Sequence, residues 1–318
     1  MSLFKKPNEL DVNVRIKMLV YGEPGIGKTT LALSSEDPVL FDFDGGINRV
    51  EYGLIKTTVQ VSQYEDILEA LNSKEIDEFK TIVIDTGGKL MDSMNVYIGK
   101  TNPKFIRANG NLTLQGYGQR KVEFRALLRL IESKKKDVIF VCHRSTVKDG
   151  DDIRYIPLFG GSSYDDLATE LDLIGYMEAS GRKRTITFDP TSHADGKNTC
   201  NMPAIMEIPT IIDEKGNITG KNDFIATQVI KRYRDRLIER STEGESYKKL
   251  MDQIKEDIGF IANPEDADAF VLKQAQYKHI GNSNLVMRDL FKKKLTELNF
   301  VFNKETRKYE KKEADKIK

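Results

Sequence analysis

One eight-residue segment carries the clearest chemistry in the sequence, because Gly22–Thr29 matches the pattern G-x-x-x-x-G-K-[ST] at every fixed position. A glycine-rich turn lets several backbone N–H groups point at the same phosphate oxygens. The Lys28 ammonium is expected to reach the β- and γ-phosphates of a nucleotide, and the Thr29 hydroxyl to bind Mg²⁺. We call residues 22–29 the phosphate-binding loop. The predicted nucleotide-binding residues are Gly22, Glu23, Pro24, Gly25, Ile26, Gly27, Lys28, Thr29 and Thr30.

A carboxylate at the end of a later apolar segment is the expected partner of this loop. Asp85 follows Thr81–Ile84 and lies 57 residues after Lys28. A carboxylate in this position can hold Mg²⁺ through a water, so the predicted metal ligands are Thr29 and Asp85. The alternative is that Asp85 only caps the turn after its strand. The complete loop motif favours the metal role.

Polar side chains also follow two other apolar segments. Asp42 and Asp44 lie at the end of residues 39–43, where an acid can orient an attacking water. Asp44 precedes two glycines, so an ordinary turn aspartate is an equally good interpretation. His143 follows residues 138–142 and either senses the γ-phosphate or serves the structure alone. The predicted catalytic residues are Lys28, Asp44, Asp85 and His143.

The alternation of apolar segments predicts an α/β fold that places these side chains at strand ends. Helices are expected directly after the phosphate-binding loop, over 64–71, and over a long amphipathic segment that ends near 134–136. Strands that alternate with helices form a mainly parallel sheet with helices on both faces. Turns near 149–151 and 180–181 predict hairpins, and therefore antiparallel edge strands. The predicted parallel strands are 16–21, 39–43, 57–61, 81–85 and 138–142.

Composition excludes several classes of protein. The 318 residues include 50 Lys and Arg against 49 Asp and Glu, so the net charge of +1 gives no sign of a globally basic surface. Cys142 and Cys200 are too few for a disulfide scaffold or a four-cysteine zinc site. No apolar run approaches the length of a membrane span or of a signal peptide. We therefore expect a cytoplasmic protein with no membrane partner.

Three regions are expected along the chain. Residues 1–218 are predicted to form the nucleotide-binding core. Residues 219–302 carry apolar side chains at helical spacing and predict a helical C-terminal region. Residues 303–318 hold seven Lys or Arg and four Asp or Glu with little to bury, so a basic, frayed tail is expected.

The order of these features resembles the ATPase core of RecA-type recombinases over about residues 12–210. The features are the phosphate-binding loop, Asp44, Asp85, His143 and Gly160–Gly161. The chain most closely resembles the phage-encoded RecA-like P-loop ATPases of the single-strand-annealing type, a group also described as AAA domain or phage nucleotide-binding proteins. The resemblance implies a RecA-like P-loop NTPase core that binds ATP and Mg²⁺ and hydrolyses ATP, in the host cytoplasm if the protein is phage-encoded.

The resemblance also assigns roles to individual residues. Asp44 takes the place of the family's catalytic glutamate and is one methylene shorter, which implies slow hydrolysis. His143 takes the place of the polar group that senses the γ-phosphate. Arg182 or Arg184 would act across a subunit interface on a neighbour's γ-phosphate, whereas a solvated turn is the simpler interpretation of this cluster.

RecA-like cores hold DNA on segments that leave the sheet, and the segment between Asp85 and the long helix is expected to be such a loop. Residues 100–121 contain no acid, and three glycines there favour flexibility. Basic groups follow phosphates while aromatic rings stack on unpaired bases, which is single-strand chemistry. The predicted partners are single-stranded DNA, further copies of the chain and a single-strand-binding protein. The predicted DNA-binding residues are Lys100, Lys104, Phe105, Arg107, Tyr117, Arg120 and Lys121.

Three alternatives to a DNA-dependent ATPase stay open. Asp85–Gly88 fits the D-x-x-G pattern of GTPase switches, although no N-K-x-D segment for guanine is present. A small-molecule kinase would need an arginine-rich lid, for which residues 182–184 are the candidate. A slow or non-hydrolysing ATP-dependent assembly scaffold would fit the shorter carboxylate of Asp44.

Overall fold

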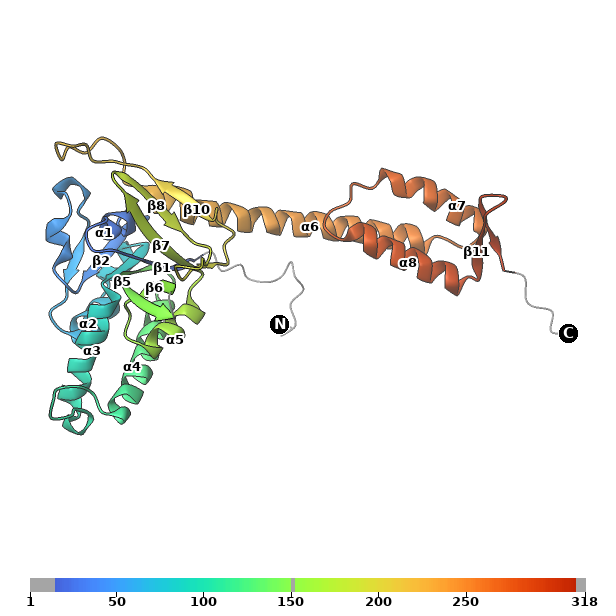
Figure 1. Cartoon of the computed structure of the whole chain (residues 1–318). Coiled ribbons are helices and arrows are strands. Elements are labelled where there is room, and N and C mark those ends of the chain that lie inside the picture. The colour runs from blue at the N-terminus through green and yellow to red at the C-terminus, as the bar shows by residue number, and fades with distance from the viewer. Residues whose placement is uncertain (1–14, 150–151, 313–318) are drawn as a thin grey trace. The chain divides into compact units, whose positions relative to one another are not determined.

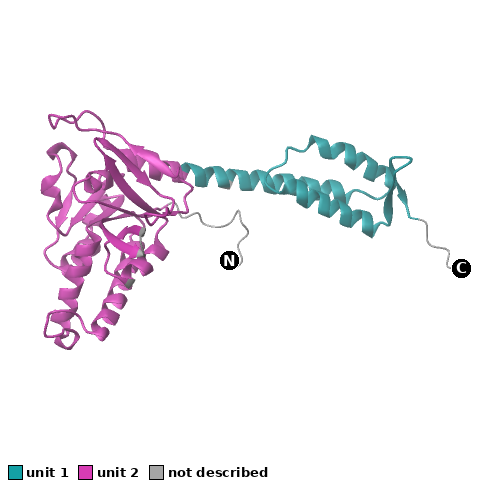
Figure 2. Ribbon diagram, in the orientation of Figure 1, with its two compact units in different colours: residues 1–12, 235–318 teal, residues 13–234 magenta. Residues whose placement is uncertain are grey.

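The computed structural model describes residues 15–149 and 152–312 and divides the chain into two compact units (Figure 2). One unit spans residues 13–234, and the other consists of residues 1–12 and 235–318. The first unit therefore extends sixteen residues beyond the boundary expected at residue 218. No helix within the described ranges is long and apolar enough to cross a membrane.

A ten-stranded, mostly parallel sheet forms the centre of the first unit, which confirms the predicted fold class (Figure 1). Its strand order is β10-β8-β7-β1-β5-β4-β2-β3, with β6 paired to β5 and β9 to β7. The strands from β3 to β7 in this order run parallel, and β6, β8, β9 and β10 are antiparallel additions. The strands are β1 (Lys17–Gly22), β2 (Pro38–Asp42), β3 (Thr58–Gln60), β4 (Thr81–Asp85), β5 (Asp137–Asp149), β6 (Asp152–Pro157), β7 (Leu173–Ser180), β8 (Lys183–Thr187), β9 (Lys197–Asn198) and β10 (Ile205–Ile208).

Helices cover both faces of this sheet, so its central strands bury both rows of side chains. On β1, Leu19 and Tyr21 belong to one apolar cluster while Met18 and Val20 belong to the other. This two-sided burial explains why the strands read as continuous apolar runs rather than alternating ones. The helices of the unit are α1 (Lys28–Ala32), α2 (Tyr64–Asn72), α3 (Gly87–Thr101), α4 (Leu114–Ser133) and α5 (Ser162–Glu170), with short helical turns η2 (Gly46–Arg49), η3 (Tyr52–Leu54), η4 (Glu75–Glu78) and η5 (Pro103–Phe105).

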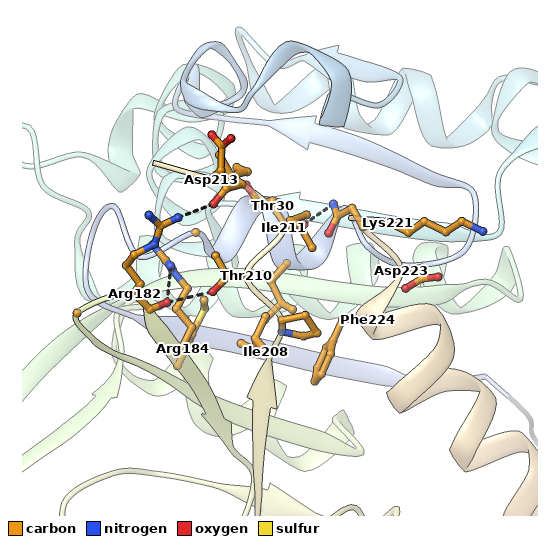
Figure 3. A pocket seen from close by; sticks show the side chains of 17 residues that line it. Thr30, Arg182, Arg184, Ile208, Thr210, Ile211, Asp213, Lys221, Asp223 and Phe224 are labelled. Carbon is orange, nitrogen blue, oxygen red and sulfur yellow. Dashed lines mark hydrogen bonds between the residues drawn. The ribbon is translucent and has the colours of Figure 1, made fainter. Parts of the chain in front are cut away.

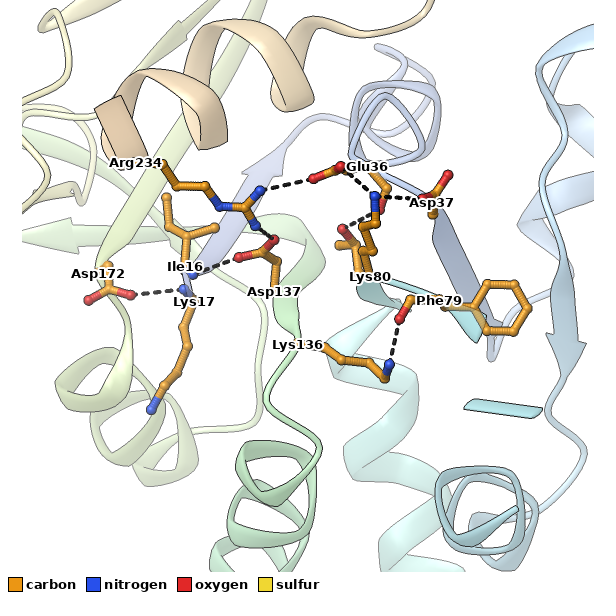
Figure 4. Close-up of polar contacts among 11 residues, drawn as sticks. Ile16, Lys17, Glu36, Asp37, Phe79, Lys80, Lys136, Asp137, Asp172 and Arg234 are labelled. Carbon is orange, nitrogen blue, oxygen red and sulfur yellow. Dashed lines mark hydrogen bonds and ion pairs between the residues drawn. The ribbon is translucent and has the colours of Figure 1, made fainter. Parts of the chain in front are cut away.

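The segment after residue 218 belongs to the core of the first unit. The π-helical turn η6 (Ile225–Ile230) buries Ile225 and Val229 in the same cluster as β1. Beyond it, Arg234 donates to the Asp137 carboxylate (2.6 Å) and to Glu36 (2.9 Å), as Figure 4 shows. The other oxygen of Asp137 accepts the backbone N–H of Ile16 (2.9 Å). This network ties the segment to the ends of β1 and β5 that lie away from the phosphate-binding loop.

The second unit is helical and ends in a hairpin. Its apolar cluster joins α6 (Lys231–Gly259), α7 (Pro264–Lys273), η7 (Gln274–Gln276) and α8 (Ser283–Glu297). The strands β11 (Phe300–Asn303) and β12 (Lys308–Lys311) pair antiparallel. The expected frayed tail was therefore wrong for residues 303–311, because Phe300 and Tyr309 supply the apolar contacts that the basic composition hid. Residues 313–318 of that predicted tail lie outside the described residues.

Candidate functional site

The phosphate-binding loop joins the end of β1 to the start of α1, the strand–loop–helix context that its motif requires. Gly25 and Gly27 have φ angles of 79° and 95°, in the left-handed region that glycine adopts without strain. A Cβ atom on Gly22 would lie 2.4 Å from the backbone oxygen of Met177 on β7. Glu23 of the loop pairs with Arg144 of β5. The loop is thus held against the strands on both sides of β1.

Thr29 and Asp85 meet at the end of the sheet where the phosphate-binding loop lies. The Thr29 hydroxyl donates to the Asp85 carboxylate at 2.5 Å, and the Asp85 residue is only 3% exposed. Burial raises the pKa of Asp85 to about 6, against the opposing hydrogen bond from Thr29. A hydroxyl and a carboxylate are hard oxygen donors of the kind that Mg²⁺ takes in phosphate sites. The two residues predicted as metal ligands therefore fit that ion together.

Lys28 is folded back over its own loop. Its ammonium donates to the backbone oxygen of Glu23 at 2.6 Å, and the residue is 5% exposed. Burial lowers the pKa of Lys28, while the nearby carboxylates, that of Asp85 foremost, oppose the shift. A cation held this way supplies a local positive charge beside the N–H groups that would face phosphate oxygens.

His143 stands between the loop and Asp85, because β5 lies between β1 and β4 in the sheet. Its Cα pairs in register with that of Gly22, the first loop residue. Burial and the charge of Lys28 lower the pKa of His143, so the imidazole is neutral at pH 7. Its Nδ1 atom is buried and has no hydrogen-bond partner among the residues that the structure describes. His143 is therefore a neutral side chain with one unpaired buried nitrogen beside the first residue of the phosphate-binding loop.

The two aspartates after β2 have different surroundings. Asp42 is buried and accepts the backbone N–H groups of Gly46 (3.0 Å) and Ile47 (3.1 Å), so it holds the turn. Asp44 is half-buried, also accepts the Gly46 N–H (2.9 Å), and lies 3.6 Å from the Arg49 guanidinium. The charge of Asp44 nevertheless contributes to the raised pKa of Asp85. Asp44 is thus both the turn aspartate of one interpretation and a charge that acts on the site.

A cavity of about 360 Å³ adjoins the loop on the side of β8 and β10, away from Asp85 (Figure 3). Gly27 and Thr30 form one wall, Ile208–Asp213 and Lys221–Phe224 another. The size is within the range of small-molecule sites, and the lining is mainly apolar with a few polar groups. No motif predicts this cavity, because the wall opposite Gly27 and Thr30 comes from segments about 180 residues beyond the loop.

The two arginines predicted to act on a neighbouring subunit form hydrogen bonds within this chain. Arg184 donates through Nε to the backbone oxygen of Ile26 in the phosphate-binding loop at 2.8 Å. Arg182 donates to the backbone oxygen of Ile212 (2.8 Å) and pairs with Glu214 (3.2 Å). Arg184 is therefore a support of the loop in its own chain, a contact that the sequence did not predict.

The predicted DNA-binding segment is mostly helical rather than a loop, which corrects that expectation. Lys100 ends α3, Lys104 and Phe105 lie in η5, and Tyr117, Arg120 and Lys121 lie in α4. Apolar contacts of Ile98, Leu112 and Phe124 stabilise this helical pair against the glycines that suggested flexibility. The segment left between the helices is the turn at residues 106–113, closed by a bridge between Ile106 and Leu112.

Arg120 differs most from its predicted role as a DNA-binding residue. Its residue is 8% exposed, and its guanidinium donates to Asn95 (3.2 Å) and to the backbone oxygen of Gly160 (3.0 Å). Lys121 pairs with Asp166 at 3.2 Å. Arg120 is thus a packing residue, whereas Lys100, Lys104 and Arg107 are exposed and form no ion pair with any described residue.

Comparison with known proteins is in keeping with this geometry. A family model described as AAA domain matches residues 15–200, the part of the chain that holds the phosphate-binding loop, Asp85 and His143. No curated protein matches the sequence. Because the match covers more than half of the 318 residues, the chain belongs to the AAA domain family and has the site of a nucleotide-binding ATPase.

Proposed function

We propose that the protein binds Mg·ATP and hydrolyses it to ADP and phosphate. The observation that carries the proposal is the contact of Thr29 with Asp85 beside the phosphate-binding loop, with His143 in register with the first loop residue. The N–H groups of the loop and Lys28 bind the phosphate oxygens, and Thr29 and Asp85 hold the ion. Mg²⁺, when bound, neutralises charge that develops on the phosphates.

The remaining polar groups suit the attack of water on the γ-phosphorus. In that step a water oxygen forms a bond to phosphorus while the bond to the β–γ bridging oxygen breaks, and the water loses a proton. We assign to the Asp44 carboxylate the role of orienting this water. Its contacts with the Gly46 N–H and with Arg49 hold the side chain at the turn after β2 and restrict its movement toward the water. Neutral His143, in register with Gly22, is offered as a donor of a hydrogen bond to a γ-phosphate oxygen.

The nucleoside half of ATP is assigned to the cavity on the other side of the loop. With the γ-phosphate toward Asp85, the base and ribose point toward Gly27 and Thr30, which line that cavity. Arg184 borders both the cavity and the loop through its bond to Ile26. The absence of an N-K-x-D segment in the sequence favours adenine over guanine.

We further propose that the ATPase acts on single-stranded DNA, in recombination or strand annealing of the phage type, with other copies of the chain and a single-strand-binding protein as partners. The support is the resemblance to RecA-like cores and the exposed cations Lys100, Lys104 and Arg107 near the α3–α4 turn. The DNA phosphates would contact these cations, while Phe105 and Tyr117 are the aromatic residues of the predicted DNA-binding segment that could stack on bases.

Calorimetry with Mg·ATP tests the nucleotide assignment. Lys28→Ala and Asp85→Asn should each weaken binding or abolish phosphate release, because they remove the phosphate cation and the metal carboxylate. Lys56→Ala, an exposed lysine outside the site, should leave both unchanged. Competition with GTP decides between ATPase and GTPase. If the folded wild-type protein gave no heat of binding when titrated with Mg·ATP, the proposal would be rejected.

The rate of phosphate release from ATP, measured with and without single-stranded DNA, tests the proposed action on single-stranded DNA. The double variant Lys104→Ala/Arg107→Ala should lower DNA affinity. It should also reduce the slope of log K against log[salt] by about 1 to 2, since each lost phosphate contact lowers that slope by about 0.7 for a single strand. The matched control is Lys74→Ala/Lys135→Ala, two exposed lysines elsewhere on the same unit. Equal losses of DNA affinity in the two double variants would exclude a specific role for the α3–α4 turn.

A further inference from the structure

The second unit separates its charges by segment. Residues 235–277 hold six Lys or Arg and ten Asp or Glu, a net charge of −4. Residues 278–312 hold ten Lys or Arg and four Asp or Glu, a net charge of +6. The balanced charge of the whole chain therefore conceals a basic region formed by α8 and the β11–β12 hairpin.

Six cations of this region face solvent and form no ion pair within the described part of the chain. On α8, Met287 and Phe291 are buried, whereas Arg288, Lys292 and Lys293 are exposed. Three more exposed cations lie at the hairpin turn and the start of β12. None of these six residues forms an ion pair with any residue in the described part of the chain. The hairpin cations are Lys304, Arg307 and Lys308.

The hairpin is fixed to the helices of its unit rather than free. The backbone N–H of Tyr309 donates to Asp268 of α7 at 3.0 Å. The Tyr309 ring packs edge-on against Phe291 of α8, with ring centroids 5.7 Å apart, and against Phe302 across the hairpin at 5.3 Å. The exposed cations of α8 and those of the hairpin thus belong to one packed body.

The element order supports a polyanionic duplex as that ligand. Three helices followed directly by a two-stranded hairpin is the order of winged helix–turn–helix modules, whose last helix enters the major groove. An α-helix fits a groove about 12 Å wide, and exposed lysines and arginines at its flanks neutralise phosphates. Here the connection from α7 to α8 covers residues 274–282 and is longer than the usual tight turn.

We propose that residues 235–312 form a duplex-DNA-binding module, with α8 and the β11–β12 hairpin as its contact surface. Arg288, Lys292 and Lys293 contact the groove and its flanking phosphates. Lys304, Arg307 and Lys308 contact the neighbouring backbone. The module binds independently of the nucleotide site in the first unit, so the chain carries a second DNA-binding surface separate from the α3–α4 turn.

Fluorescence anisotropy with a duplex of about 25 base pairs, measured on the full chain over a range of salt concentrations, tests this proposal. Arg288→Ala/Lys292→Ala/Lys293→Ala should lower affinity at least about tenfold at low salt. It should also reduce the salt slope by about 2 to 3, at about 0.9 for each lost phosphate contact. Lys304→Ala/Arg307→Ala/Lys308→Ala should act in the same direction.

The matched control replaces three exposed lysines on the acidic segment of the same unit, Lys248, Lys249 and Lys255, by alanine. This control should leave affinity within about twofold, and thermal melting should show that all three variants fold. Equal losses in control and test variants, or unchanged duplex affinity in both test variants, would overturn the proposal. Tighter binding of a single strand than of the duplex by the same residues would overturn the duplex assignment.

Discussion

Asp85 is both a predicted metal ligand and a buried carboxylate that destabilises the ligand-free protein at neutral pH. Its burial at the end of β4 raises its pKa to about 6, while an unfolded aspartate titrates near 4. The folded protein without ligand therefore holds on to a proton that the unfolded chain releases. Its stability falls as the pH rises from about 4 to about 6, and the full cost of the charged form is present at pH 7.

Asp85→Asn should stabilise the ligand-free protein at pH 7 by about 2 kcal/mol, because asparagine removes the buried charge and can still accept the Thr29 hydroxyl. Urea unfolding in EDTA measures this gain, and it should largely disappear near pH 3, where Asp85 is protonated in both states. An equal gain at pH 3 and pH 7 would show that the pKa of Asp85 is not raised in the folded state.

The same titration should appear in ligand binding with the opposite sign. A metal-binding carboxylate must be deprotonated, so the Mg²⁺-dependent part of ATP affinity should fall as the pH drops below about 6. Calorimetry with a non-hydrolysable ATP analogue, with and without Mg²⁺, measures this Mg²⁺-dependent contribution to affinity from pH 7.5 to pH 5. The Asp85→Asn variant should show a flat profile, and a similar decline in that variant would assign the effect to another group.

At the scale of elements, the site depends on which strands are neighbours. The insertion of β5 between β1 and β4 places His143 beside the phosphate-binding loop and leaves Asp85 within reach of Thr29. On the other side, β7 contacts the first loop residue so closely that only glycine fits. The hairpin of β7 and β8 then brings Arg184 to the loop carbonyl of Ile26.

Gly22→Ala should destabilise the protein by about 1–3 kcal/mol and weaken ATP binding at least tenfold. The added Cβ would meet the Met177 backbone oxygen at 2.4 Å and push the loop away from β7. Thermal unfolding and calorimetry measure the two effects. Gly118→Ala is the control, because a Cβ there meets nothing within 4 Å and should be neutral or stabilising.

Arg184→Met should weaken ATP binding about tenfold with a small change in stability. The guanidinium of Arg184 orients the loop through Ile26 and borders the cavity assigned to the nucleoside. Lys183→Met, which loses an exposed ion pair with Glu207 and does not line the cavity, is the matched control. Equal affinities in the two variants would remove Arg184 from the site.

At the scale of the molecule, each compact unit has its own apolar cluster and its own electrostatic character. The first unit is completed by residues beyond the family match, because Ile225 and Val229 fill the cluster beneath β1 and Arg234 neutralises a buried carboxylate. The Asp137 side chain is fully buried, and desolvation raises its pKa in spite of the cation. Loss of Arg234 would remove the guanidinium from this carboxylate, whose other oxygen accepts the Ile16 N–H.

Arg234→Met should therefore destabilise the first unit by about 2–4 kcal/mol, since an uncompensated buried charge costs more than the ion pair contributes. The double variant Arg234→Met/Asp137→Asn should recover most of the loss. Chemical unfolding of the full chain measures both. Lys80→Met, which breaks exposed pairs with Glu36 and Asp37, should cost much less than Arg234→Met, because exposed ion pairs contribute little.

Sequence reasoning went furthest where chemistry is local. The eight residues of the phosphate-binding loop carry their own backbone requirement, and short apolar runs mark buried strands, so the motif and the parallel sheet could be predicted. Charge and glycine content were poor guides elsewhere. They suggested a loop at residues 100–121 and a frayed tail after residue 303, where packing of Phe124 and Tyr309 stabilises helix and hairpin.

The order of amino acids alone was enough to predict the phosphate-binding loop, the alternation of strands and helices, and the carboxylate at the end of β4. The position of His143 beside Gly22, the support of the loop by Arg184 and the cavity walled by residues 208–224 follow from the three-dimensional fold. The physical reason is range. Local motifs fix backbone geometry within a few residues, whereas these contacts join segments 120 to 200 positions apart and depend on strand order and packing.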